Sequence, residues 1–333
     1  MKFLLTAINA KFIHSNPAIY SLRAGVGEKL QPYVELAEFT INESLESILE
    51  GIWKRQPKVI GFSCYIWNWK LIREILTELP KILPDTEIWL GGPEVTYDGP
   101  GLLREFPQVT GIMVGEGEVT FREVLEQYLR EAETAGQSEQ QPESDSTEHQ
   151  VADRRGTVAG KSMVERFGQI PGLCLASGYT APRDLTDLTT LPFLYEDMEP
   201  FTNRIIYYET SRGCPYRCSY CLSSIDKKVR LRDISVVKRE LQFFLDQNVK
   251  QVKFIDRTLN CDHKHAMEIW RYIYEHDNGV TNFHFEISAD ILREEEIALL
   301  NRFRPGLAQL EIGVQSTNPE TIRAIHRVMD VDK

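Results

Sequence analysis

Long apolar runs are absent from this chain of 333 residues. A helix needs about 18 consecutive apolar residues to cross a bilayer, and no segment approaches that length. The apolar start of the chain ends after about six residues, which is too early for a secretory signal peptide. We therefore expect a cytoplasmic protein that has no membrane association and begins with a buried strand.

Basic side chains are also scarce, because 38 Lys and Arg stand against 49 Asp and Glu, for a net charge of −11. Phosphate contacts need clustered basic side chains, so this balance argues against broad binding to nucleic acid. The segment 227–232 (KKVRLR) is the best candidate for a basic patch. A solvated loop is the simpler interpretation of that segment.

Aromatic residues are missing between Tyr128 and Phe167, where Glu, Gln, Ser, Asp and Thr accumulate. Such a composition cannot bury enough apolar surface to offset the entropy lost on ordering. We expect a disordered acidic linker or insertion over 131–165. It separates a domain at 1–130 from a connecting segment at 166–203 and a second domain at 204–333.

The first domain alternates apolar runs with amphipathic stretches. Strands are expected at 3–8, 34–39, 59–65, 87–90 and 112–114, and helices at 17–30, 44–55, 70–79, 99–106 and 119–130. Apolar strands separated by helices are typical of a parallel, doubly wound sheet, so the fold class is α/β. The pattern fits a flavodoxin-like (Rossmann-type) sheet, which binds ligands beyond the carboxyl ends of its strands.

A second alternating series follows the connecting segment. Strands are expected at 205–209, 251–255, 283–287 and 307–313, and helices at 236–246, 264–275, 294–303 and 319–329. The series predicts a partial (β/α) TIM-like barrel. Four units leave an edge strand unpaired, so we expect a barrel truncated from a longer protein.

Cysteine is used sparingly, and half of the six cysteines crowd into one short segment. They are Cys64, Cys174, Cys214, Cys218, Cys221 and Cys261. The three isolated cysteines are interpreted as small core residues. The crowded three have the spacing C-x3-C-x2-C, which in a reducing compartment indicates a metal site instead of a disulfide framework.

Thiolates are soft ligands suited to the iron of a cluster. Cys214, Cys218 and Cys221 would hold three corners of a [4Fe–4S] cube and leave the fourth iron open to a small molecule. A structural zinc site is the alternative. Zinc prefers four ligands, so His263 or Cys261 would have to complete it.

With the aromatic Tyr220 before the last cysteine, this spacing resembles the radical S-adenosylmethionine (SAM) superfamily, from about residue 204 to the end. The resemblance implies that the open iron binds SAM and that reduction of the cluster cleaves it to a 5′-deoxyadenosyl radical. It also implies an electron donor such as flavodoxin or ferredoxin, and a small molecule or biosynthetic intermediate as substrate. The family places SAM-binding groups near the cluster and at strand ends. The matching positions are Tyr220, Asp256, Glu286, Ser288, Glu311 and Gln315.

For each of these strand-end positions, a structural role is the alternative. The Gly-Gly-Glu motif by which many members bind the SAM amine is not found after the second strand of this domain.

Glycine-containing turns follow the strands of the first domain, where backbone amides can approach a ligand closely. Preceding a radical SAM module, these turns resemble the cobalamin-binding domain of cobalamin-dependent radical SAM proteins. The positions expected to contact cobalamin are Ser63, Gly91, Gly92, Pro93, Gly115 and Glu116. The D-x-H-x-x-G motif that supplies a cobalt ligand in many cobalamin proteins is absent, and His14 is the candidate in its place.

The leading hypothesis is an enzyme that uses SAM, a [4Fe–4S] cluster and cobalamin, with methyl transfer to an unactivated centre as the outcome. A cobalamin-independent radical oxidation, cyclisation or rearrangement is the first alternative. A non-catalytic iron–sulfur protein or inactive fragment is the second. Methylthiotransferases of tRNA carry a further cysteine triad, but only Cys64 and Cys174 precede Cys214 here.

Overall fold

The computed structural model describes residues 2–138 and 162–333. It divides into two units, one spanning Met1–Thr186 with Leu194–Glu196 and the other spanning Asp187–Phe193 with Asp197–Lys333. Within the described residues, no helix combines the length and apolarity needed to span a membrane. Most of the expected linker, residues 139–161, lies outside the described residues.

The first unit is built on a sheet with the strand order β2-β1-β3-β4-β5-β6-β7. Strands β1 to β5 pair in parallel, as expected. Their bounds are β1 Phe3–Asn9, β2 Val34–Thr40, β3 Val59–Ser63, β4 Glu87–Gly91 and β5 Val109–Met113. Every residue of β1 is buried, including the polar Thr6 and Asn9, which explains why apolar and polar residues do not alternate along this strand.

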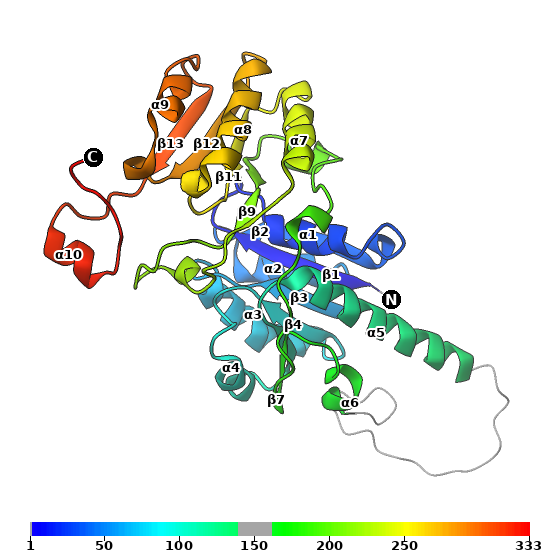
Figure 1. Ribbon diagram of the computed structural model, residues 1–333. Coiled ribbons are helices and arrows are strands. Elements are labelled where there is room, and N and C mark those ends of the chain that lie inside the picture. The colour runs from blue at the N-terminus through cyan, green and yellow to red at the C-terminus, as the bar shows by residue number, and fades with distance from the viewer. Residues whose placement is uncertain (1, 139–161) are drawn as a thin grey trace, which may run out of the picture. The chain divides into compact units, whose positions relative to one another are not determined.

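Helices cover both faces of this sheet, so the α/β doubly wound architecture is confirmed (Figure 1). The helices are α1 Pro17–Gly25, α2 Leu45–Trp53, α3 Trp69–Ile82, α4 Gly99–Glu105, α5 Gly117–Ser138 and α6 Met163–Phe167. Apolar residues of α2, α3 and α4 form one core, and those of α1, α5 and α6 form the other. Helix α1 is shorter than expected because the chain turns at Gly27, whose φ is +79°.

The segment expected as a connection contributes to the first sheet instead. Strands β6 (Leu173–Leu175) and β7 (Gly178–Tyr179) form an antiparallel hairpin on the edge of β5. The unit therefore runs through Thr186. Strands this short show no periodicity in the sequence, but pairing with β5 covers an edge that would otherwise be exposed.

A buried arginine joins α6 to the rest of this unit. The side chain of Arg166 is inaccessible to solvent and pairs with Glu87 of β4 at 3.1 Å and with Glu131 of α5 at 2.9 Å. Two carboxylates on one guanidinium offset the cost of burying the charge. Since α5 continues to Ser138, Glu131 belongs to a helix and not to the start of a linker.

The second unit contains a parallel sheet with the strand order β13-β12-β11-β8. The strands are β8 Ile206–Tyr208, β11 Gln251–Phe254, β12 Asn282–Ile287 and β13 Ala308–Ile312, and the helices are α7 Ile234–Asp246, α8 His263–Glu275, α9 Glu294–Leu300 and α10 Pro319–Ala324. This is the partial barrel that was predicted. Helix α10 ends earlier than expected, at Ala324, and His326 two residues later adopts a left-handed φ of +54°.

Apolar and polar side chains alternate along the strands of the second sheet, which gives the sheet one apolar and one polar face. Phe254 and Phe285 are fully buried, and Trp270 of α8 packs on the latter with ring centroids 6.2 Å apart. The intervening residues, such as Lys253 and Glu286, point to the opposite face because side chains alternate along a strand. The predicted SAM-binding carboxylates of β12 and β13 therefore belong to the face away from the helices.

Candidate cofactor sites

The cysteine loop of the second unit is closed at its base by two short antiparallel strands, β9 (Ser211–Arg212) and β10 (Arg230–Leu231). Gly213 follows β9 with a φ of +94°, and a Cβ there would lie 2.4 Å from the carbonyl oxygen of Lys228. Only glycine fits this position. The N–H of Cys214 then donates to the carbonyl of Asp226 at 2.9 Å, so the first cysteine starts from a fixed backbone.

All three cysteines of the loop are free thiols. Cys214 and Cys218 are buried, Cys221 is half-buried, and the neighbouring Tyr220 is exposed. Among the described residues, no three His, Cys, Asp or Glu side chains converge closely enough to hold a single metal ion. A [4Fe–4S] cube presents a different iron to each thiolate, so its ligands need not converge on one point. The donor set of three free thiols in one loop therefore fits such a cluster.

His263, one of the residues considered for a zinc site, is engaged elsewhere. Its Nδ1 lies 2.9 Å from Oε1 of Glu296, a carboxylate with no solvent exposure. Cys261 is half-buried at the end of the short helix Leu259–Cys261, and burial raises the pKa of its thiol to about 11.

Asp256, which follows β11, is fully buried and accepts three hydrogen bonds. Its carboxylate accepts from the N–H of Thr210 at 3.0 Å and from the hydroxyls of Thr210 and Ser211 at 2.6 Å each. Thr210 also lies 3.2 Å from Nε2 of His265. Burial raises the pKa of Asp256 and lowers that of His265. The aspartate thus ties the end of β11 to the residues that lead into the cysteine loop, and contact with SAM stays a prediction.

The structure brings Glu286 and Glu311 together as register partners on β12 and β13. Lys253 of β11 lies 3.0 Å from Glu311 and 3.9 Å from Glu286. His284 lies 3.1 Å from Glu311. The hydrogen bond from Lys253 lowers the pKa of Glu311, whereas burial and the charge of Glu311 raise that of Glu286. Sequence reasoning missed Lys253 because one lysine in an apolar strand gives no motif.

The other two predicted SAM positions, Ser288 and Gln315, follow β12 and β13. Ser288 is buried after β12, where its N–H donates to Asn260 at 3.0 Å and its hydroxyl donates to Asp290 at 2.7 Å. Gln315 is exposed beyond β13, with a left-handed φ of +63°.

Buried polar side chains also organise the carboxyl edge of the first sheet. Asn68 is fully buried, donates to the carbonyls of Ile8 and Ser63 at 3.0 and 2.9 Å, and accepts from the N–H of Tyr65 at 2.8 Å. The hydroxyl of Ser63 accepts from Asn16 at 3.3 Å. These contacts fix the loops that follow β1 and β3.

The predicted glycine turns lie at the same edge. Gly92 has a φ of +110°, and a Cβ there would lie 2.5 Å from the carbonyl oxygen of Cys64. Pro93, which follows it, is half-buried. The N–H of Cys64 donates to the carbonyl of Gly91 at 2.7 Å, so the two loops are in direct contact.

Gly115 has a φ of +80° and open space where a side chain would be. The neighbouring Glu116 accepts from the N–H of Thr186 at 2.7 Å. The backbone at Gly115 is therefore accessible, whereas the Glu116 carboxylate is engaged within the unit.

Large apolar side chains are exposed on the loops that follow β1, β3 and β4. They are Phe12, Ile13, Ile66, Trp67 and Tyr97, which we call the apolar rim. Trp67 also stacks on Tyr65 with ring centroids 4.3 Å apart. An exposed apolar group of this size is typical of a ligand or partner surface. His14 lies half-buried in the loop after β1, and its carbonyl accepts from Asn9 at 3.0 Å.

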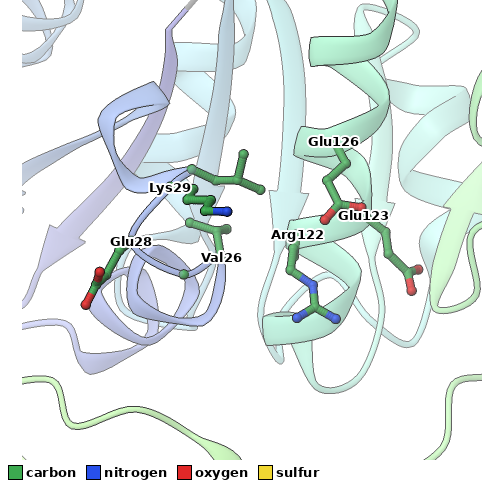
Figure 2. A pocket seen from close by; sticks show the side chains of 8 residues that line it. Val26, Glu28, Lys29, Arg122, Glu123 and Glu126 are labelled. Atoms are coloured by element: carbon green, nitrogen blue, oxygen red, sulfur yellow. The ribbon is translucent and has the colours of Figure 1, made fainter.

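A separate depression of about 630 Å³ lies between the loop after α1 and helix α5. Figure 2 shows its charged lining, with Glu28 and Lys29 on one side and Arg122, Glu123 and Glu126 on the other. None of the predicted cofactor-binding residues lines it.

Two family models match the chain. The B12 binding domain matches residues 4–125, and the radical SAM superfamily matches residues 208–333. The chain is 28% identical over 225 residues to 2-(S-pantetheinyl)-carbapenam-3-carboxylate methyltransferase of Streptantibioticus cattleyicolor, a match that covers 64% of this chain and 29% of the relative. It is 26% identical over 220 residues to the cobalamin-dependent radical SAM methyltransferase TokK of Streptomyces tokunonensis, covering 60% of this chain and 27% of the relative.

A solved structure has the same fold. It is that of the cobalamin-dependent S-adenosylmethionine radical enzyme OxsB with aqua-cobalamin and SAM bound, with a TM-score of 0.71 and 15% identity, covering 99% of this chain and 46% of OxsB. The chain spans less than a third of each of the two methyltransferases.

Proposed function

We propose that this chain, which belongs to the radical SAM superfamily and carries a B12-binding domain, takes part in methyl transfer from SAM to an unactivated carbon or phosphorus centre. The observation that carries the proposal is the presence in one chain of a loop with three free cysteines and a parallel sheet with an apolar rim. When bound, the cluster supplies the electron that cleaves SAM and cobalamin supplies a methyl carrier.

In the second unit, Cys214, Cys218 and Cys221 would ligate the cluster. Asp256 would hold the backbone ahead of Cys214 through Thr210 and Ser211. This rigidity matters because a ligand loop that is already ordered loses less entropy when it binds.

The polar face of the second sheet would receive SAM. Glu286 and Glu311 can accept hydrogen bonds from the amine or the ribose hydroxyls, and Lys253 keeps Glu311 ionised. Ser288 and Gln315 would add polar contacts at the ends of β12 and β13. Tyr220, exposed beside Cys221, would contact SAM near the cluster.

In the first unit, the loops after β3, β4 and β5 would hold cobalamin. Ser63, Gly91, Gly92, Pro93, Gly115 and Glu116 are the proposed contacts. Gly115 exposes backbone, and the apolar rim would cover the macrocycle and exclude water. We further propose a cytoplasmic location, a small molecule or biosynthetic intermediate as substrate, and reduction by a flavodoxin or ferredoxin.

The test is anaerobic reconstitution of the full chain with iron, sulfide and hydroxocobalamin, followed by incubation with SAM and dithionite. Methyl transfer from SAM leaves S-adenosylhomocysteine, whereas radical cleavage leaves 5′-deoxyadenosine. We expect both products, with S-adenosylhomocysteine dependent on added cobalamin. Cys218→Ser serves as the variant that lacks a cluster ligand, and Cys174→Ser, a buried cysteine of the first unit, is its matched control.

Formation of 5′-deoxyadenosine without cobalamin-dependent S-adenosylhomocysteine would favour the cobalamin-independent alternative. Absence of both products, with no iron bound, would refute the proposal.

A further inference from the structure

An arginine from a distant part of the chain approaches the cysteine loop. Arg327 follows α10, and its Nη1 lies 4.0 Å from Sγ of Cys218. Its Nη2 donates to the carbonyl of Gly313, just beyond β13. The guanidinium is therefore held between the end of a barrel strand and the sulfur of a predicted cluster ligand.

The backbone on both sides supports this placement. The N–H of Ser219 donates to the carbonyl of Ile325 at 2.9 Å, so the loop and the arginine-bearing segment are joined directly. The N–H of Arg327 donates to the carbonyl of Ile322 at 3.1 Å, which anchors the arginine to α10. His326, between these two hydrogen-bonded residues, adopts a left-handed φ of +54°.

The contact between Arg327 and Cys218 is shielded from solvent. Cys218 is only 5% exposed. The Nε atom of Arg327 is buried and, within the described part of the chain, has no hydrogen-bond partner. An arginine stays protonated at every pH that a protein tolerates, so its charge is permanent.

We propose that Arg327 tunes the reduction potential of the iron–sulfur cluster through Cys218. Reduction places one additional electron on the cluster and its thiolates. A fixed cation and an N–H close to one of those sulfurs stabilise the reduced state more than the oxidised state. Arg327 thereby makes it easier for a low-potential donor, a flavodoxin or ferredoxin, to deliver the electron. The inference rests on cluster ligation by Cys214, Cys218 and Cys221.

The test is a redox titration of the reconstituted full chain without SAM, followed by electron paramagnetic resonance of the reduced cluster. At a fixed solution potential near the midpoint, Arg327→Gln should lower the ratio of reduced to oxidised cluster about tenfold, which is about 59 mV for a one-electron couple. Arg327→Lys, which keeps the charge, should show a smaller change. Arg323→Gln, an exposed arginine of α10, should match the wild type.

Iron content is measured for every variant. A wild-type midpoint in Arg327→Gln with full iron content would overturn the proposal. So would loss of iron from both Arg327 variants, because Arg327 would then hold the loop and not tune its potential. A wild-type midpoint combined with weaker SAM binding would assign Arg327 to SAM instead. If the wild-type chain binds no cluster, the proposed function fails together with this inference.

Discussion

Replacing Asp256 tests how the cysteine loop is held. Asp256→Ala removes the acceptor of three buried hydrogen bonds. The two hydroxyl donors can rotate toward other acceptors, but the N–H of Thr210 cannot. One buried N–H without a partner costs about 2 kcal/mol, and the exchange of two hydroxyl bonds for weaker ones to other acceptors adds about 1 kcal/mol. Asp256→Asn keeps an acceptor for the N–H and should cost about 1 kcal/mol.

Hydrogen exchange followed by mass spectrometry can locate this loss of local stability, because it reports local opening for each peptide separately. A cost of about 3 kcal/mol corresponds to exchange more than about a hundredfold faster. We expect that acceleration in peptides that cover 206–212 and 251–256 of Asp256→Ala, and a smaller one in Asp256→Asn. The amount of iron bound after reconstitution should be lowest in Asp256→Ala and intermediate in Asp256→Asn.

Asp246→Asn is the matched control, because Asp246 is an exposed carboxylate at the end of α7. Peptides of the first unit should exchange at the wild-type rate in every variant. Unchanged exchange in Asp256→Ala would refute the reasoning. If SAM binding were weakened in that case, the aspartate would contact SAM and not hold the loop.

Three further outcomes follow from buried or constrained groups. Burial lowers the pKa of His265, so the unfolded chain binds a proton at a higher pH than the folded chain does. The free energy of unfolding of the second unit should therefore decrease as the pH is lowered from about 6.5. Urea titrations at several pH values should show a smaller decrease in His265→Gln. Arg166→Met leaves two partly buried carboxylates without their cation and should destabilise the first unit by about 3 kcal/mol in urea unfolding followed by tryptophan fluorescence. An unchanged midpoint would contradict this. Gly92→Ala should lower the melting temperature more than Gly115→Ala does, because only the first substitution places a Cβ against a carbonyl oxygen. Equal decreases in melting temperature would exclude that clash.

The strands of both sheets could be predicted from the sequence because burial leaves a local pattern, on both faces in the first sheet and on one face, with alternation, in the second. Strand β1 is mostly apolar and buried along its whole length, and each parallel strand needs a helix before the next. The cysteine loop could also be predicted, since its three thiols lie within one short segment.

What the sequence could not predict depends on contacts between distant residues. The Nδ2 of Asn68 bonds the carbonyl of Ile8, 60 positions earlier, and Lys253 meets Glu311, 58 positions later. No local motif marks either pair. Asp256 illustrates the same limit: its position at a strand end suggested a ligand contact, but the chain before the cysteines takes all three of the hydrogen bonds described for its carboxylate.

Asn68 and Asp256 meet the same physical requirement in the two units. Where a parallel strand ends, its next N–H and C=O groups leave the ladder and still need partners. A buried amide or carboxylate just beyond a strand end supplies them. Asn68 does so for Tyr65 of its own loop and for Ile8 of the neighbouring strand, and Asp256 does so for Thr210. The side chain that satisfies the backbone also fixes the loop that follows it. A loop fixed in this way loses little entropy when it binds a ligand, so the polar residues that complete each sheet should also favour binding of the proposed cofactors.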